Sequence, residues 1–282
     1  MGDTLRVLFA ASGRKQRKGA HEKIHRGFGR LFRRRADFYA IDDTFDTIDA
    51  GWVTDRYEPN GFTSAFFDGD NRLKLDISTA DSVNNRPSGF SSTFYNFQGR
   101  KRALGDIGGN WRVSIDFYVS AAMLTSTTRW EGDLWVRDNN PDESQAFYPS
   151  MWIGRYDANN FYAGTDLKTY FGAFDSATGA LIEVEQTSLT AGWNTMTIAY
   201  NGTSFEHYFN GNLFYTSQPG SVSPFNAAGT VFVQGMNFSN TTTNGDSYSL
   251  YFDNLQAVPE PMSMTLLALG LGALAKRRAA RK

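Results

Sequence analysis

The sequence of 282 residues has no cysteine, only eight prolines and only three histidines. Without cysteine the chain can form neither a disulfide nor a thiolate-ligated zinc site. Two of the histidines, His21 and His25, lie in a basic N-terminal stretch, and His207 lies in a strand-like segment. A Ser-His-Asp triad or a histidine metal cluster is therefore not expected.

Basic residues are scarce over most of the chain. Residues 1–36 hold eleven Lys and Arg against two acidic residues, and residues 276–282 hold five more Lys and Arg. The residues between them carry 12 basic and 27 acidic side chains. Because nucleic-acid-binding domains carry their basic stripe on the folded part, the acidic body indicates that nucleic acid is not a partner.

Residues 1–36 are expected to be a disordered basic tail outside the fold. A nucleic-acid or membrane-surface arm is one alternative. A wrongly assigned start is another, because Ala36–Ala40 reads like the mature N terminus left after a signal peptide is cleaved.

Aromatic residues and glycine are abundant, with 23 Phe, 13 Tyr and 27 Gly. Aromatic side chains favour pleated sheets, and glycine favours tight turns. Strict alternation of apolar and polar residues over Arg72–Ile77 and Arg112–Val119 predicts strands with one buried face. Other strand-like segments lie at Ala180–Gln186, Thr230–Met236 and Ser247–Val258.

No helical period, internal repeat or linker interrupts residues 41–258. Ten or more short strands predict an all-β fold, an antiparallel jelly-roll β-sandwich in one domain over these residues.

A three-stranded meander is the clearest local prediction. Its strands are Trp193–Tyr200, Thr203–Phe209 and Asn212–Thr216, separated by Asn201-Gly202 and Asn210-Gly211. Both central residues of a type I′ turn need positive φ, which Asn and Gly tolerate. Two-residue turns are therefore expected at both steps.

The body also resembles a known family in the run from Gly192 to Gly211, which is similar to a strand pair of laminin G-like domains in the concanavalin A-like superfamily. The resemblance implies a jelly roll. Members of that superfamily bind sugars, hydrolyse them or hold surfaces together, so the fold does not decide the function.

The last residues form an ordered signal: Pro259-Glu260-Pro261, an uncharged stretch over 262–275 and a basic end at 276–282. As a helix, the 14-residue stretch would span about 21 Å, less than a hydrocarbon core of roughly 30 Å. The arrangement over 258–282 resembles the PEP-CTERM sorting signal of Gram-negative bacteria. A helix docked on the domain is the alternative.

The PEP-CTERM resemblance implies an exported protein. Residues 262–275 would form a short apolar helix that holds the chain transiently in the inner membrane. An exosortase would recognise Pro259, Glu260 and Pro261, and the protein would reach the cell surface or the extracellular matrix.

Retaining β-glucanases of this fold carry their catalytic carboxylates in a Glu-x-Asp-x-x-Glu pattern on one strand. The nearest match begins at Glu131 and Asp133 but has Val136 where the second glutamate should stand, and valine cannot transfer a proton. Glu183 and Glu185 share a strand face, as exposed glutamates on an edge strand commonly do. We therefore predict that the chain is not an enzyme.

Sugar binding would use exposed aromatic rings, and the candidates in the aromatic-rich middle are Trp130, Trp135, Trp152, Tyr156 and Tyr162. Burial in the core is the competing explanation for each ring. The sequence predicts a non-catalytic surface or matrix protein that binds carbohydrate or exopolysaccharide. A purely structural envelope protein and a divergent glycoside hydrolase are the alternatives.

A structural Ca²⁺ ion is the one cofactor for which the sequence offers ligands. Asp68, Asp70 and Asn71 cluster their oxygens in one turn, and Asp43 and Asp253 could join if the first and last strands pair. Ordinary turn chemistry explains the same Asp-Gly-Asp-Asn run.

Overall fold

The computed structural model describes residues 40–78, 96–105, 107, 110–139, 146–175, 178–217, 227–238 and 246–259. All of them belong to the compact unit Phe38–Lys282. The expected basic tail (1–36) and apolar helix (262–275) lie outside these residues. No helix within the described ranges is long and apolar enough to cross a membrane.

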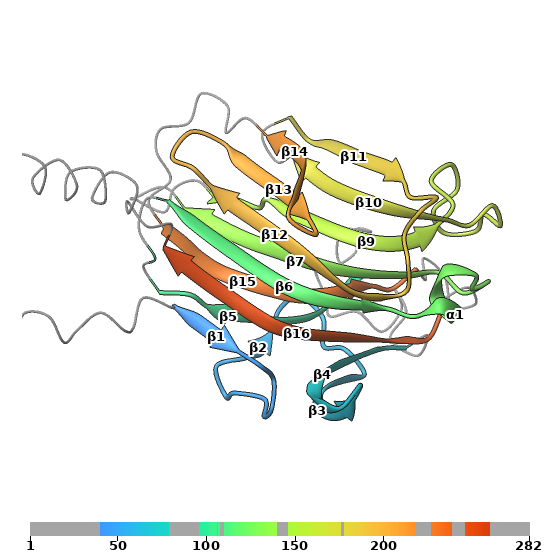
Figure 1. Cartoon of the computed structure of the whole chain (residues 1–282), viewed down its shortest axis with the longest axis horizontal. Coiled ribbons are helices and arrows are strands. Elements are labelled where there is room, and N and C mark those ends of the chain that lie inside the picture. The colour runs from blue at the N-terminus through green and yellow to red at the C-terminus, as the bar shows by residue number, and fades with distance from the viewer. Residues whose placement is uncertain are drawn as a thin grey trace, which may run out of the picture. The chain divides into compact units, whose positions relative to one another are not determined.

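Two antiparallel sheets make up the fold (Figure 1). Eight strands form the first sheet in the order β14-β13-β12-β6-β16-β4-β3, with β1 pairing along β16. Their bounds are β1 (Ile41–Asp43), β3 (Gly61–Phe67), β4 (Asp70–Ile77), β6 (Trp111–Val119), β12 (Gly192–Tyr200), β13 (Phe205–Phe209), β14 (Asn212–Ser217) and β16 (Tyr248–Pro259).

The second sheet also has eight strands, in the order β11-β10-β9-β7-β15-β5-β2, with β8 pairing along β7. Their bounds are β2 (Val53–Thr54), β5 (Phe97–Ala103), β7 (Trp130–Asn139), β8 (Ala146–Phe147), β9 (Ser150–Tyr156), β10 (Lys168–Asp175), β11 (Ala180–Glu185) and β15 (Ala227–Met236). The short helix α1 (Ala121–Leu124) lies at one end of the long strands (Figure 1). The predicted all-β jelly-roll sandwich is confirmed.

The main core lies between the sheets and follows from period-two alternation. On β6, Val113, Ile115 and Phe117 are fully buried, with polar residues between them. Across the core, Phe171 of β10 stacks on Phe209 of β13 with ring centroids 3.9 Å apart. Burying each such side chain contributes about 1.5–3 kcal/mol, so this layer is the main source of stability.

A second, smaller core covers the outer face of the second sheet. Trp152, Tyr156, Met236 and Phe238 are buried there. Strand β9 is consequently buried on both faces, with Met151 and Ile153 facing the main core and Trp152 and Tyr156 facing outward. This outer layer positions the candidate site.

The meander over β12, β13 and β14 is present. Asn210 and Gly211 have φ of 49° and 75°, as a two-residue type I′ turn requires. Gly202 also has positive φ, 92°, but the first turn was predicted wrongly. The Asn201 side chain accepts hydrogen bonds from the amides of Thr203 and Ser204, which lengthens that loop to four residues.

Strand β16 ends at Pro259, which lies opposite Trp111 of β6. Proline has no N–H to donate, so it is tolerated at the end of a strand. The first proline of the Pro-Glu-Pro motif thus belongs to the sheet, whereas Glu260 and Pro261 lie outside the described residues.

Candidate functional site

Strand β7 presents two carboxyl groups on its outer face. Its even-numbered residues enter the main core, where Leu134 and Val136 are fully buried. Its odd-numbered residues, Glu131, Asp133 and Trp135, therefore point to the outer face. A glutamate at position 136 would point away from Glu131, so no side chain at that position could complete the site on this face.

Glu131 and Asp133 form a buried acid pair, with 3% and 1% of their surfaces exposed. Burial raises the pKa of Glu131 well above its ordinary value, and the charges of Asp133 and Glu183 raise it further. Burial also raises the pKa of Asp133, although the hydrogen bond from Trp135 and the charge of Arg56 oppose this.

Because the two carboxyl groups interact, they titrate together. The hydrogen bond between them raises the pKa of Glu131 and lowers that of Asp133, so this contact favours the protonated form of Glu131. Oδ2 of Asp133 is buried and receives no hydrogen bond from any N–H or O–H group among the described residues.

A third carboxylate approaches from the edge strand β11. The Tyr156 hydroxyl donates a 2.6 Å hydrogen bond to Oε1 of Glu183, and it accepts a 2.8 Å hydrogen bond from Nε1 of Trp152. Burial, followed by the charges of Glu131 and Glu183, raises the pKa of Tyr156 far above its ordinary value. Tyr156 therefore keeps its proton and acts as a donor.

Two glycines make room for these side chains. A Cβ at Gly172 would lie 1.9 Å from the Trp152 ring, so Trp152 can cross β10 only because residue 172 is glycine. A Cβ at Gly154 would meet the Tyr156 ring at 2.8 Å and Cγ of Glu131 at 3.1 Å. Tyr156 and Glu131 thus share the space above Gly154.

Arg56 covers the other side of Asp133. Its guanidinium lies 4.5 Å from the centroid of the Trp135 ring and donates a 3.0 Å hydrogen bond to Oε1 of Gln234. Gln234 lies directly opposite Asp133 in the pairing of β15 with β7. Trp135 in turn donates a 3.2 Å hydrogen bond to Oδ1 of Asp133.

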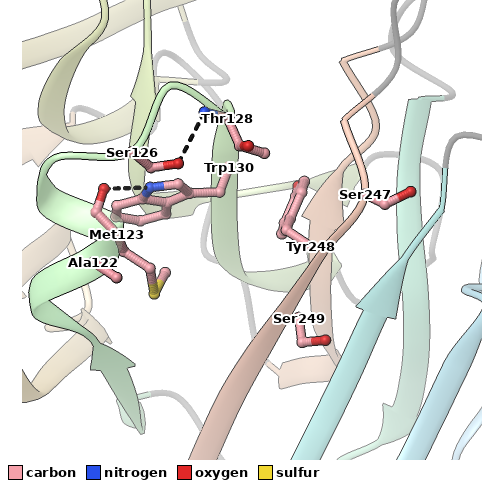
Figure 2. A pocket seen from close by; sticks show the side chains of 8 residues that line it. All are labelled: Ala122, Met123, Ser126, Thr128, Trp130, Ser247, Tyr248 and Ser249. Atoms are coloured by element: carbon pink, nitrogen blue, oxygen red, sulfur yellow. Dashed lines mark hydrogen bonds between the residues drawn. The ribbon is translucent and has the colours of Figure 1, made fainter.

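Four of the five aromatic residues predicted for sugar binding lie on this outer face. Trp135, Trp152 and Tyr156 surround the carboxyl groups, with at most 6% exposed, and Tyr162 is half-buried at the edge of the outer core. Stacking of these rings on a sugar stays a prediction. Trp130 instead packs in the main core and donates to the Met123 carbonyl oxygen (Figure 2), so it has no free ring face for a sugar.

A neutral hollow of about 210 Å³ lies beside Trp130, at the start of β7. Figure 2 shows the side chains that line it. Hydroxyl-bearing side chains of Ser126, Thr128, Ser247 and Ser249 contribute to its lining. None of the three carboxylates lines it. Tyr248 also lines the hollow, and its hydroxyl accepts a 3.4 Å hydrogen bond from the backbone amide of Glu131.

The residues proposed to bind calcium have protein partners instead. Asp68 and Gly69 have φ of 50° and 89° and form the tight turn between β3 and β4. Asp68 accepts a hydrogen bond from Trp193, and Asp70 accepts one from the amide of Asn71. The run is thus explained as a turn.

The remaining calcium candidates are neutralised by arginine. Strands β1 and β16 do pair, but Asp43 lies 2.8 Å from Arg102 and Asp253 lies 2.7 Å from Arg72. No group of three or more His, Asp or Glu side chains that could hold a metal ion occurs in the part of the chain that the structure describes. Calcium binding at these residues stays a prediction.

Sequence reasoning found Glu131, Asp133 and Glu183 but not their grouping. It passed over Arg56 and Gln234 entirely. Their contacts depend on the order of β5, β15 and β7 in the sheet. No local pattern in the sequence predicts that strand order.

We compared the chain with protein families, curated proteins and solved structures. No protein-family model matches the chain, and no curated protein matches it. Solved structures do: a glycoside hydrolase family 16 endo-glucanase from Bacteroides ovatus is 11% identical, covers 77% of this chain and 99% of its own, and has a TM-score of 0.48. The β-glucanase of Bacillus licheniformis is 12% identical, with coverage of 80% and 100% and a TM-score of 0.41.

A third matched structure is an immunostimulatory antigen and pseudo β-1,3-glucanase of Mycobacterium tuberculosis. It is 12% identical, covers 80% of this chain and 100% of its own, and has a TM-score of 0.45. At such identities the likeness concerns the jelly-roll fold, and the activities belong to those proteins.

These findings correct the prediction that the chain is not an enzyme. Glycoside hydrolases are among the solved structures that match it. The prediction also rested on Val136, and the structure shows that position 136 faces the main core.

Proposed function

We propose that the chain acts on glycans as a divergent glycoside hydrolase with Glu131 as its general acid. The observation that carries the proposal is the buried pair of Glu131 and Asp133 on the outer face of β7. Strongly shifted carboxyl groups beside a further charged partner are a common property of catalytic sites.

The proposed general-acid catalysis requires Glu131 to be protonated. A glycosidic oxygen leaves as an alcohol only if an acid protonates it as the C–O bond breaks. Burial, followed by the charges of Asp133 and Glu183, raises the pKa of Glu131 and so favours its protonated form, which the proposed acid requires. Asp133 accepts the hydrogen bond from Glu131 and so orients the acid.

The aromatic residues around the pair supply surfaces of the kind that sugar rings stack on. In this structure they close over it: Phe161 packs edge-on against Tyr156 with centroids 4.9 Å apart. A glycan therefore reaches Glu131 when the loop that carries Phe161 and Tyr162 moves aside. Both residues are only partly buried.

Release of reducing ends from soluble polysaccharides tests the proposal. The full chain should hydrolyse at least one polysaccharide in a panel of mixed-linkage β-glucan, laminarin, xylan and galactan. Glu131→Gln should lower kcat by at least about 100-fold, because a general acid typically contributes a factor of 10² to 10⁴. Glu185→Gln is the matched control, since Glu185 is exposed and paired with Lys168. Equal rates for wild type and Glu131→Gln would refute the role of Glu131.

We also propose that the protein is exported and sorted through residues 258–282, with the inner membrane as an intermediate and the cell surface or matrix as the destination. The order of Pro259-Glu260-Pro261, the apolar stretch 262–275 and the basic end supports this proposal. An exosortase-type enzyme is the expected partner, with an exopolysaccharide as the expected glycan.

A reporter experiment tests the sorting proposal. An exported reporter carrying residues 256–282 should stay in the membrane fraction of a host without exosortase and should be released, with the tail lost, in a host with a matching one. Changing Pro259 and Pro261 to alanine should abolish processing but keep membrane retention. Changing Leu267 and Leu271 to aspartate should free the reporter, since each charge costs about 2.5–3.5 kcal/mol at a helix centre. A soluble, unprocessed reporter in both hosts would contradict the proposal.

A further inference from the structure

We infer that Glu183 is the second catalytic carboxylate of this site, acting from the edge strand β11 as the base that activates the attacking water, with Tyr156 as the residue that positions it. The inference rests on the proposed hydrolase function. Glu183 would thus supply the second catalytic carboxylate, which Val136 on β7 cannot supply.

Strand pairing places Glu183 on the correct face. It lies opposite Gly172 of β10, which lies opposite Trp152 of β9, which lies opposite Asp133 of β7. Residues directly opposite one another in antiparallel strands share a face. Glu183 and Asp133 therefore stand in one cross-sheet row on the outer face of the second sheet.

Tyr156 connects the two carboxylates. Its ring lies beside Glu131 above Gly154, and its hydroxyl donates a 2.6 Å hydrogen bond to Glu183. Tyr156 therefore stands between the two carboxyl groups to which the inference assigns the acid and base roles.

Trp152 orients the hydrogen bond between Tyr156 and Glu183. Trp152 donates to the Tyr156 hydroxyl at 2.8 Å, and the absence of a side chain at Gly172 lets the indole reach that position. With its acceptor side used by Trp152, the hydroxyl directs its own proton to Glu183. Glu183 is half-buried, so its carboxylate is more accessible than Glu131 or Asp133.

Strands β9 and β10 separate β7 from β11, which places the two backbones about 14 Å apart at roughly 4.8 Å per strand. The Trp152 and Tyr156 side chains of β9 lie between the two acids, so the proposed mechanism requires the water to enter beside these rings together with the glycan. An acid and a base that act on opposite sides of the sugar invert its anomeric configuration, and in inverting glycosidases the two carboxyl groups are about 6.5–9.5 Å apart.

In the proposed reaction, water displaces the leaving group in a single step. The C–O bond to the leaving group breaks as Glu131 gives its proton to the leaving oxygen. The oxygen of the water bonds to the anomeric carbon, and Glu183 takes the proton that this water loses. Exchange of protons with solvent restores Glu131 and Glu183 to their starting states.

The test is the anomeric configuration of the first product, followed by proton NMR during hydrolysis of mixed-linkage β-glucan by the full chain. The inference predicts inversion, that is, an α-anomer from a β-linked glucan. Retention would overturn the role of Glu183 and leave Glu131 as the acid. This readout needs no variant, so it does not depend on the folding of any substitution.

Variants provide the second arm. Glu183→Gln should lower kcat by at least about 100-fold, whereas Glu185→Gln, two residues along the same strand, should leave it unchanged. Tyr156→Phe keeps the ring but removes the donor, so the acidic limb of the pH–rate profile should move to higher pH. A merely structural role for Tyr156 would not move that limb.

The failure of the inference and that of the proposed function are distinct outcomes. Activity in Glu183→Gln equal to that of Glu185→Gln, combined with loss of activity in Glu131→Gln, would overturn only the inference. A wild-type chain that hydrolyses no β-glucan and no other polysaccharide of the panel would overturn both.

Discussion

The hydroxyl of Tyr215 on β14 donates a hydrogen bond of 3.0 Å to Oδ2 of Asp175 on β10 and so joins the two sheets near one edge of the sandwich. His207 of β13 lies beside this contact, with its ring centroid 6.0 Å from that of Tyr215. The His207 side chain is completely buried. Burial lowers its pKa to about 4, although the backbone of Tyr215 and the charge of Asp175 oppose the shift.

The first prediction concerns acid stability. Below pH 6.5 the unfolded chain protonates His207 and the folded chain does not, so stability falls as the pH drops from 6.5 to about 4. At 1.36 kcal/mol per pKa unit this contributes a loss of about 3 kcal/mol. Urea unfolding at several pH values should show that His207→Leu loses less stability over this window than wild type. Parallel curves for the two proteins would rule out a buried neutral histidine.

The second prediction concerns Glu131, whose ionisation makes stability fall as the pH rises. Its pKa is raised on folding, so its contribution to stability is complete below about 4.5 and is lost as the pH rises toward the folded value. Glu131→Gln stays neutral and can still donate to Asp133. It should therefore be more stable than wild type at pH 7 and more so at pH 8, as measured by thermal unfolding. A variant less stable than wild type at every pH would count against a protonated Glu131.

The third prediction concerns Gly172. An added methyl group would overlap the Trp152 ring, so Gly172→Ala should cost about 1–3 kcal/mol and displace the indole that holds Tyr156. Gly51→Ala is the control, because a Cβ at residue 51 comes closest to the exposed side chain of Asp49. Denaturant unfolding of both variants checks this, and equal stability would show that Trp152 does not need the space.

The sequence predicted the strands of the first sheet best, because that sheet is buried on one face only. Strands β4, β6 and β16 alternate buried and more exposed residues, and the two Asn-Gly steps announced β12 to β14. It did not delimit β9, in which six of seven residues are buried. A strand covered on both faces has no period of two, so its apolar run can equally be read as part of a core helix.

The same double burial explains what was missed at the site. Aromatic residues such as Trp152 were expected either in the core or exposed to sugars, and they instead form a second core around carboxyl groups. Tyr156 and Glu183 are 27 residues apart, and their hydrogen bond depends on two strand registers. Motif spacing along one strand found Glu131 but could not find a partner supplied by another strand.

The fourth prediction is also the most direct test of the account, because the proposed chemistry requires that Glu131 hold a proton at neutral pH. The full chain labelled with carbon-13 at the glutamate carboxyl groups can be titrated by NMR. One glutamate should remain protonated at pH 7, and its signal should be absent from Glu131→Gln and present in Glu185→Gln. If every glutamate titrates near its ordinary value, Glu131 is ionised at neutral pH and the proposed general acid does not exist.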